Sequence, residues 1–288
     1  MASLRETKDR IGSVRSTLKI TSAMKLVASS KLRRAQNAIE SLRPYEEALQ
    51  GILRSSSQGV DKVKALSGTE EKDPFVQKPS GRTAIVAIAS NSSLCGAFNS
   101  NVIRKVLELT SRDPDATVFS LGRKVADVLK RSGFQSPADY NSLVAKPSYE
   151  EAGSLAEMLC AGYDEGRFSS VVLVYNHFVS TSRQEVRVEE YLPFGNEYES
   201  GPDDVEGYYI FEPGAGEIVA ELLPKVIRLK LYAAVLDSVA AEHAARTVAM
   251  QTATDNAQEL LSDLTLEYNK GRQQKITAEI LELVGGQQ

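Results

Sequence analysis

The chain has 288 residues, of which 42% are hydrophobic and 25% are charged, and its formal net charge is −4. These totals are typical of a soluble protein with one large domain, or with a modest domain and an extension. No apolar run approaches the roughly 18–20 residues of a membrane-spanning helix. Charged residues near the start argue against a secretory signal, and Cys95 and Cys160 favour reduced thiols in a cytosolic, bacterial protein.

A heptad pattern runs through the first segment, from residue 3 to about residue 54. Its 4-3 positions begin at Leu4, end at Leu53 and never change phase, which favours a coiled-coil helix over a globular one. Every charged residue between Arg10 and Ile39 is basic, so this helix should seek acidic partners. Pro44 interrupts the pattern and should bend or break the helix.

The middle of the chain has a different texture. Residues 55–80 are polar and loop-like, and an alternation of strands and helices follows. Buried strands are expected at residues 82–89, 116–121 and 171–175, helices at 102–109, 122–131 and 149–166, and an edge strand at 184–192. Such alternation predicts a mainly parallel sheet with helices on its faces.

The last segment returns to the 4-3 pattern. It starts near Glu212 and Pro213, its seam runs from Val219 to Tyr268, and Pro224 predicts an early kink. A helix of this length would extend roughly 100 Å, which no compact domain contains. The charged residues between Glu189 and Glu221 are all acidic.

We therefore expect an α/β fold in which the N- and C-terminal helices form a long antiparallel two-helix coiled coil. Its root would be a central Rossmann-like α/β domain with a mainly parallel sheet. The expected limits are residues 1–56 for the first helix, 57–80 for a linker, 81–195 for the central domain, 196–212 for an acidic connector and 213–288 for the last helix.

Catalytic motifs are missing from the sequence. It contains neither a phosphate-binding loop nor a dinucleotide fingerprint, and only one glycine, Gly96, follows the first strand. His177 and His243 are far apart, and neither cysteine lies in a C-x-x-C motif. Spacing alone leaves a Cys–His nucleophile pair open. We expect no cofactor, no metal site and no catalytic residue.

Several stretches resemble the gamma subunit of bacterial F-type ATP synthases, and together they cover essentially the whole chain. They are Ile20–Gln36, Arg43–Tyr45, Leu94–Asn99, Tyr175–Phe178, Glu242–Arg246, Ala249–Met250, Ala253–Ala257, Tyr268–Gln273, Ile276–Thr277 and Val284–Gly286. One departure stands before Leu94, where the family usually has Asp-Arg-Gly and this chain has Asn91-Ser92-Ser93.

The resemblance implies the central rotor shaft of a proton-driven rotary motor at the cytoplasmic face of the bacterial membrane. The coiled coil would thread a ring of alpha and beta subunits, which hold the nucleotides. The α/β domain would form a foot with the epsilon subunit on the c-subunit ring, with one copy per complex. The shaft would drive the binding changes at the beta subunits.

The same resemblance implies roles for particular residues. The expected beta-subunit contacts are Met24, Lys25, Lys270, Arg272 and Gln273. The tip that turns in an upper bearing would be Ile276, Ile280, Leu283 and Val284. The contacts with the c ring and epsilon would be Tyr209, Phe211 and Glu212.

Two alternatives remain open at this point. A basic coiled coil also fits a nucleic-acid-binding protein, which would show a steep salt dependence of binding. An enzyme of the α/β domain would need a cluster of polar residues at the carboxyl end of the sheet. The sequence offers no such cluster.

Overall fold

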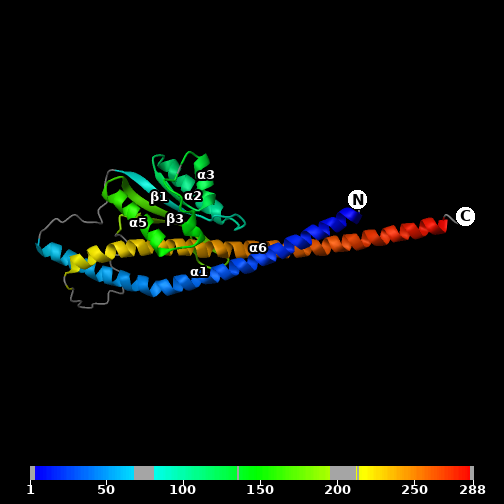
Figure 1. Ribbon diagram of the computed structural model, residues 1–288, viewed down its shortest axis with the longest axis horizontal. Coiled ribbons are helices and arrows are strands. Elements are labelled where there is room, and N and C mark those ends of the chain that lie inside the picture. The colour runs from blue at the N-terminus through cyan, green and yellow to red at the C-terminus, as the bar shows by residue number, and fades with distance from the viewer. Residues whose placement is uncertain (1–3, 68–80, 135, 195–211, 213, 286–288) are drawn as a thin grey trace. The chain divides into compact units, whose positions relative to one another are not determined.

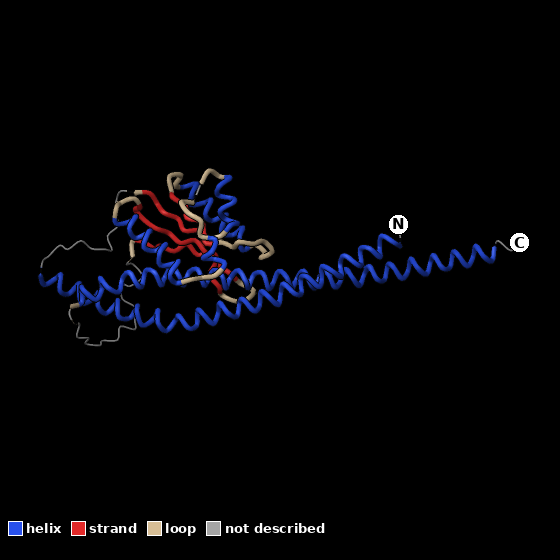
Figure 2. Tube along the Cα trace, in the orientation of Figure 1, coloured by secondary structure: helices blue, strands red, loops and turns tan. Residues whose placement is uncertain are grey.

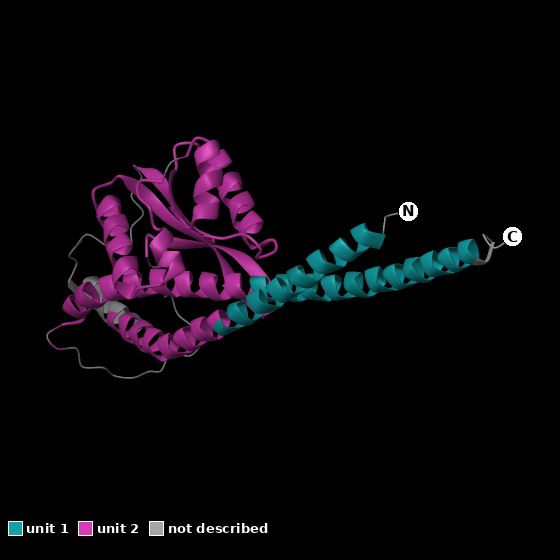
Figure 3. Cartoon of the chain, turned by 45° about the vertical axis from the view of Figure 1, so that its right-hand side comes forward, with its two compact units in different colours: residues 1–30, 246–288 teal, residues 31–245 magenta. Residues whose placement is uncertain are grey.

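The computed structural model describes residues 4–67, 81–134, 136–194, 212 and 214–285, with the side chains at 54, 57–67, 284 and 285 outside the description. The chain divides into two compact units, residues 1–30 with 246–288 and residues 31–245 (Figure 3). Two long helices, α1 (Leu4–Ser67) and α6 (Ala215–Gly285), contribute to both units. The limits expected for the domains stay a prediction.

The first unit, residues 1–30 and 246–288, is an antiparallel pair of helical segments. The hydroxyl oxygens of Thr21 and Thr254 lie 2.9 Å apart. Near the other end, a Cβ built on Gly271 would lie 3.1 Å from Leu4 Cδ2, so Leu4 faces Gly271. Leu4 precedes Thr21 in α1, whereas Gly271 follows Thr254 in α6, so the two segments run in opposite directions. The predicted seam is confirmed, because each of its positions in this unit is buried or half-buried.

The second unit, residues 31–245, is built around a four-stranded sheet in the order β2-β1-β3-β4 (Figures 1 and 2). Strand β1 (Arg82–Ile88) pairs in parallel with β2 (Thr117–Leu121) and β3 (Phe168–Phe178), and β4 (Gln184–Leu192) is antiparallel to β3. The mainly parallel sheet and its edge strand are therefore confirmed.

Helices cover both faces of this sheet. Helices α2 (Phe98–Arg112) and α3 (Arg123–Arg131) lie on one face, and α5 (Tyr149–Asp164) lies on the other with parts of α1 and α6 (Figure 1). A short helix, α4 (Asn141–Ala145), was not expected. The strand residues divide between two cores: Val86 and Ile88 belong to the larger one, whereas Ile85 and Ala87 belong to the core under α2 and α3. Burial on both faces explains the unbroken apolar run in β1.

One expectation about the long helices was wrong. Helix α1 runs through residues 55–67, which we expected to be a loop; the stretch is rich in serine but contains no proline to interrupt the helix. Pro44 lies inside α1 and Pro224 inside α6, so neither residue ends its helix, and of the bend or break expected at Pro44 the break does not occur. Leu49 and Leu53, after Pro44, are buried in the core, and this packing offsets the missing helix hydrogen bond.

Candidate partner-contact surfaces

The turn after β1 is tied together by its own polar groups. Asn91 Nδ2 donates to the carbonyl oxygen of Asn141 (2.8 Å), and Asn91 Oδ1 accepts from the backbone amide of Arg123 (3.0 Å). Asn99 Nδ2 lies 3.2 Å from the sulfur of Cys95, whose side chain is buried. These groups therefore hold the turn against α3 and α4, and this bonding gives Asn91 a structural role.

His177 on β3 and Cys160 on α5 are held in the packed interior of the second unit. His177 Nδ1 lies 2.6 Å from Asp237 Oδ2, and the other oxygen of Asp237 accepts from the backbone amide of Phe178 at 2.9 Å. This arrangement joins β3 to α6. Burial, reinforced by the carboxylate of Asp164, raises the pKa of the Cys160 thiol to about 11, so this cysteine stays protonated and unreactive at neutral pH.

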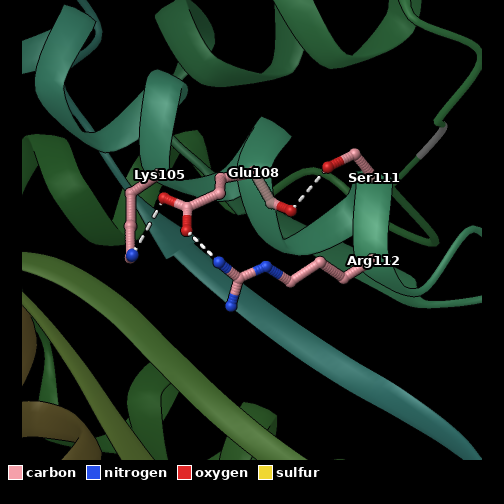
Figure 4. Close-up of polar contacts among 4 residues, drawn as sticks. All are labelled: Lys105, Glu108, Ser111 and Arg112. Carbon is pink, nitrogen blue, oxygen red and sulfur yellow. Dashed lines mark hydrogen bonds and ion pairs between the residues drawn. The ribbon is translucent and has the colours of Figure 1, made fainter.

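The charges on the outer side of α2 bind one another (Figure 4). Lys105 Nζ lies 2.9 Å from one carboxylate oxygen of Glu108 and Arg112 lies 2.6 Å from the other, while Ser111 Oγ donates to the Glu108 carbonyl at 2.7 Å. The hydrogen bond and charge of Lys105, joined by Arg112, hold the pKa of Glu108 below its usual value. This is a surface ion-pair network at helical spacing rather than a catalytic cluster.

The first expected contact surface lies on α1 in the helix pair. Met24 and Lys25 are half-buried, and beside them three large apolar side chains are exposed: Ile20 (60%), Leu26 (68%) and Val27 (57%). Exposed apolar residues grouped in this way mark a contact with a partner. The sequence analysis did not single out these three residues. They fall outside the phase of the seam, and this was a signal that their side chains would be exposed.

The second expected surface is the C-terminal part of α6. Lys270, Arg272 and Gln273 are exposed, and so are Ile276 (45%), Ile280 (55%) and Leu283 (74%). Helix α6 continues from Gly271 to Gly285 beyond the position opposite Leu4, where the described part of α1 begins. The side chain of Val284 lies outside the described residues.

These two surfaces are separate. Thr254 faces Thr21, which is close to Met24 in α1, and Lys270 lies 16 residues further along α6. At 1.5 Å per residue this places Lys270 roughly 24 Å from Thr254 along the helix. Of the residues expected to contact the c ring and epsilon, Glu212 is exposed, whereas Tyr209 and Phe211 lie outside the described residues.

Neither a membrane span nor a metal cluster is found in the described part of the chain. Among the described residues, no helix combines the length and the hydropathy that crossing a membrane requires. Within the same part of the chain, no three His, Cys, Asp or Glu side chains are grouped as a metal site would need.

Comparisons with known proteins agree along the whole chain. The family model described as ATP synthase matches residues 3–288. The ATP synthase gamma chain of Bacteroides fragilis is 46% identical over 297 residues, covering 99% of both chains, and that of Phocaeicola vulgatus is 46% identical over 294 residues, with 99% of both chains covered.

Solved structures give the same result for the fold. A chain of the central stalk and c-ring structure of the Tetrahymena thermophila mitochondrial ATP synthase is 25% identical, with a TM-score of 0.59 over 81% of this chain and 99% of that chain. A chain of the Euglena gracilis mitochondrial ATP synthase, 19% identical, has a TM-score of 0.65 over 98% of this chain and 93% of that chain, and it supports the fold alone. The resemblance in the sequence is thus confirmed, and this chain belongs to the family of ATP synthase gamma chains.

Proposed function

We propose that this chain is the central rotor shaft of a proton-driven ATP synthase. It couples rotation of the c ring to conformational changes at the nucleotide sites of the beta subunits, for ATP synthesis and hydrolysis. The observation that carries the proposal is the match to gamma chains along 99% of both sequences.

The helix pair suits a shaft. Its segments are antiparallel and bury a narrow seam that includes Thr21, Ala28, Ala257 and Leu264. Small residues such as Ala28 and Ala257 let two helices approach closely and keep the rod slender. Six of the seven basic residues between Arg10 and Arg34 are exposed, and exposed ion pairs are worth only about 0–1 kcal/mol each. Such contacts let a rotor push against its surroundings without being trapped at one angle.

The contact residues follow from this role. Met24 and Lys25, with their exposed apolar neighbours, face one loop of a beta subunit, and Lys270, Arg272 and Gln273 face another. The exposed apolar residues Ile276, Ile280 and Leu283, together with Val284, turn in the upper bearing of the alpha–beta ring. Their exposure in the free chain supports a partner that covers them.

The foot of the rotor is the α/β domain. Glu212 is exposed and, with Tyr209 and Phe211, is the proposed contact with the epsilon subunit and the c ring. The chain would then be a peripheral subunit at the cytoplasmic face of the bacterial membrane. It would act without catalytic residues of its own, and the side chain of Asn91 in the turn after β1, which binds backbone groups of α3 and α4, supports this non-catalytic role.

Co-purification from membranes tests the proposal against the nucleic-acid alternative. A tagged full-length chain is expected to bring down alpha, beta, epsilon and c subunits, with one copy of the chain per complex as counted by mass spectrometry. Retention on DNA that falls steeply with salt, without those subunits, would instead support a nucleic-acid-binding coiled coil.

A further inference from the structure

A polar cavity of about 450 Å³ lies between α1, the sheet and α6 in the second unit. Helix α1 bows away from α6 in this region (Figures 2 and 3). The wall contributed by α1 consists of Ile39, Glu40, Leu42, Arg43, Glu46 and Gln50. Buried apolar contacts of α1 flank the cavity, at Leu32 and Ala35 on one side and at Leu49 and Leu53 on the other.

Pro44 stands in the middle of this wall. A proline inside a helix has no amide hydrogen for the carbonyl four residues earlier, here that of Glu40, and its ring pushes that turn apart. The bow of α1 therefore has a local cause. Its consequence is a cavity with charged groups in its lining, between two buried apolar contacts of α1.

The cavity holds an ion pair between α6 and β4. Lys230 Nζ, from α6, lies 2.9 Å from Glu189 Oε1 on β4, and the hydroxyl of Tyr175 donates to Glu189 Oε2 at 2.9 Å. Glu189 thus has both oxygens occupied. Glu46, from α1, accepts a hydrogen bond from Gln50 within its own helix (3.3 Å), and the charges of Glu189 and Lys230 both act on it.

The surroundings of Glu46 act on its pKa in both directions. Burial raises its pKa above the usual value, and Glu189 and Glu47 raise it further, against the opposing effect of Lys230 and Arg43. The other charged or titratable groups that line the cavity are Glu40 on α1, His177 and Arg187 on the sheet, and Asp237 on α6. His177 and Asp237 already bind each other.

We propose that this cavity is a proton-sensitive joint between α1 and the α/β domain, with Glu46 as its switch. When Glu46 is protonated, its carboxyl group becomes a hydrogen-bond donor toward the carboxylate of Glu189, and α1 closes on the domain. When Glu46 is ionised, it competes with Glu189 for Lys230, and α1 is held more loosely. The inference goes beyond the proposed rotor role, because it concerns how one helix is attached to the foot whatever the foot binds.

The direction of the pH effect follows from the raised pKa. A carboxyl group that is harder to ionise in the folded chain than in the unfolded chain stabilises the fold below its unfolded pKa, and this contribution is lost as the pH rises through the folded pKa. The attachment of α1 is therefore firmest in acid and weakens as the pH rises through the folded pKa of Glu46.

Amide hydrogen exchange of the full-length chain tests the joint, with Glu46→Gln as the variant and Glu47→Gln as its matched control. The control removes a carboxylate from the next position of the same helix, where the side chain is 70% exposed. At pH 8, Glu46→Gln should slow exchange of the α1 amides between residues 40 and 50, by about tenfold for each unit by which the fold raises the pKa. At pH 4 the variant and the wild type should match. At pH 8, Glu47→Gln removes only one of the smaller contributions to the raised pKa of Glu46, so it should slow exchange much less than Glu46→Gln does.

A second variant reverses the sign. Lys230→Gln removes the shared cation, so exchange in the same α1 segment should become faster at pH 8, and adding Glu46→Gln should restore most of the protection. The proposal is overturned if Glu46→Gln and Glu47→Gln behave alike at pH 8, or if Lys230→Gln has the same effect with and without the Glu46 carboxylate.

Discussion

At the scale of single residues, Asn91 links the turn after β1 to two helices. Both ends of its side-chain amide are used, one toward the backbone of α3 and the other toward the backbone at the start of α4. The sequence predicted the turn itself, but these partners lie 32 and 50 residues away and leave no local signal.

Replacing Asn91 by alanine should destabilise the α/β domain. The change removes two hydrogen bonds, each worth about 0.5–1.5 kcal/mol net, and leaves backbone groups of α3 and α4 without their partner. Chemical unfolding of the full-length chain should show the loss. Asn101→Ala, which removes only a surface contact with Arg104, is the control and should change stability little. Equal stability of the two variants would mean that the turn needs no such tie.

A second prediction at the scale of single residues concerns Met24. A lysine at this half-buried position adds a cation beside the basic residues of α1, and an extra ion pair with an acidic partner would favour one rotor angle over the others. We expect Met24→Lys to reduce ATP-driven proton pumping more than complex assembly. The comparison is with Ala23→Lys, which adds the same charge at the neighbouring exposed position. Normal pumping at a normal hydrolysis rate in Met24→Lys would refute the prediction.

At the scale of elements, the heptad phase was the most informative feature of the sequence. Positions from Leu4 to Leu53 and from Val219 to Tyr268 are all buried or half-buried as the phase predicts, because one face of a long helix has to be covered along its entire length. The strands followed from continuous apolar runs. The end of α1 did not follow, since residues 55–67 are polar and rich in serine and were read as a loop.

The seam of the helix pair gives a matched test. Leu264 is 4% exposed and Leu266, two positions away on the same helix, is 68% exposed. Truncating a buried leucine to alanine costs about 2–5 kcal/mol, whereas an exposed position loses almost nothing because alanine is the better helix former. Thermal unfolding should therefore show a large loss for Leu264→Ala and little change for Leu266→Ala. Similar effects in both would mean that the seam phase is wrong.

At the scale of the whole molecule, we propose that this chain transmits rotation and that its partners carry out the reaction of ATP. The isolated chain should accordingly neither bind nor hydrolyse ATP, because its sequence contains no phosphate-binding loop and the Asn91 side chain after β1 is engaged with backbone groups of α3 and α4. Titration calorimetry of the purified chain should give no heat of binding. Micromolar affinity for ATP would contradict this expectation.

The central claim is that the chain rotates, and a probe on the α/β domain of the assembled complex tests it most directly. Arg131→Cys places a thiol at the exposed end of α3. Labelling should be selective, since Cys95 is buried and burial raises the pKa of Cys160 to about 11. With the alpha–beta ring fixed to a surface, the probe should turn steadily in one direction while ATP is hydrolysed. A probe that stays at one angle during undiminished hydrolysis would contradict the account.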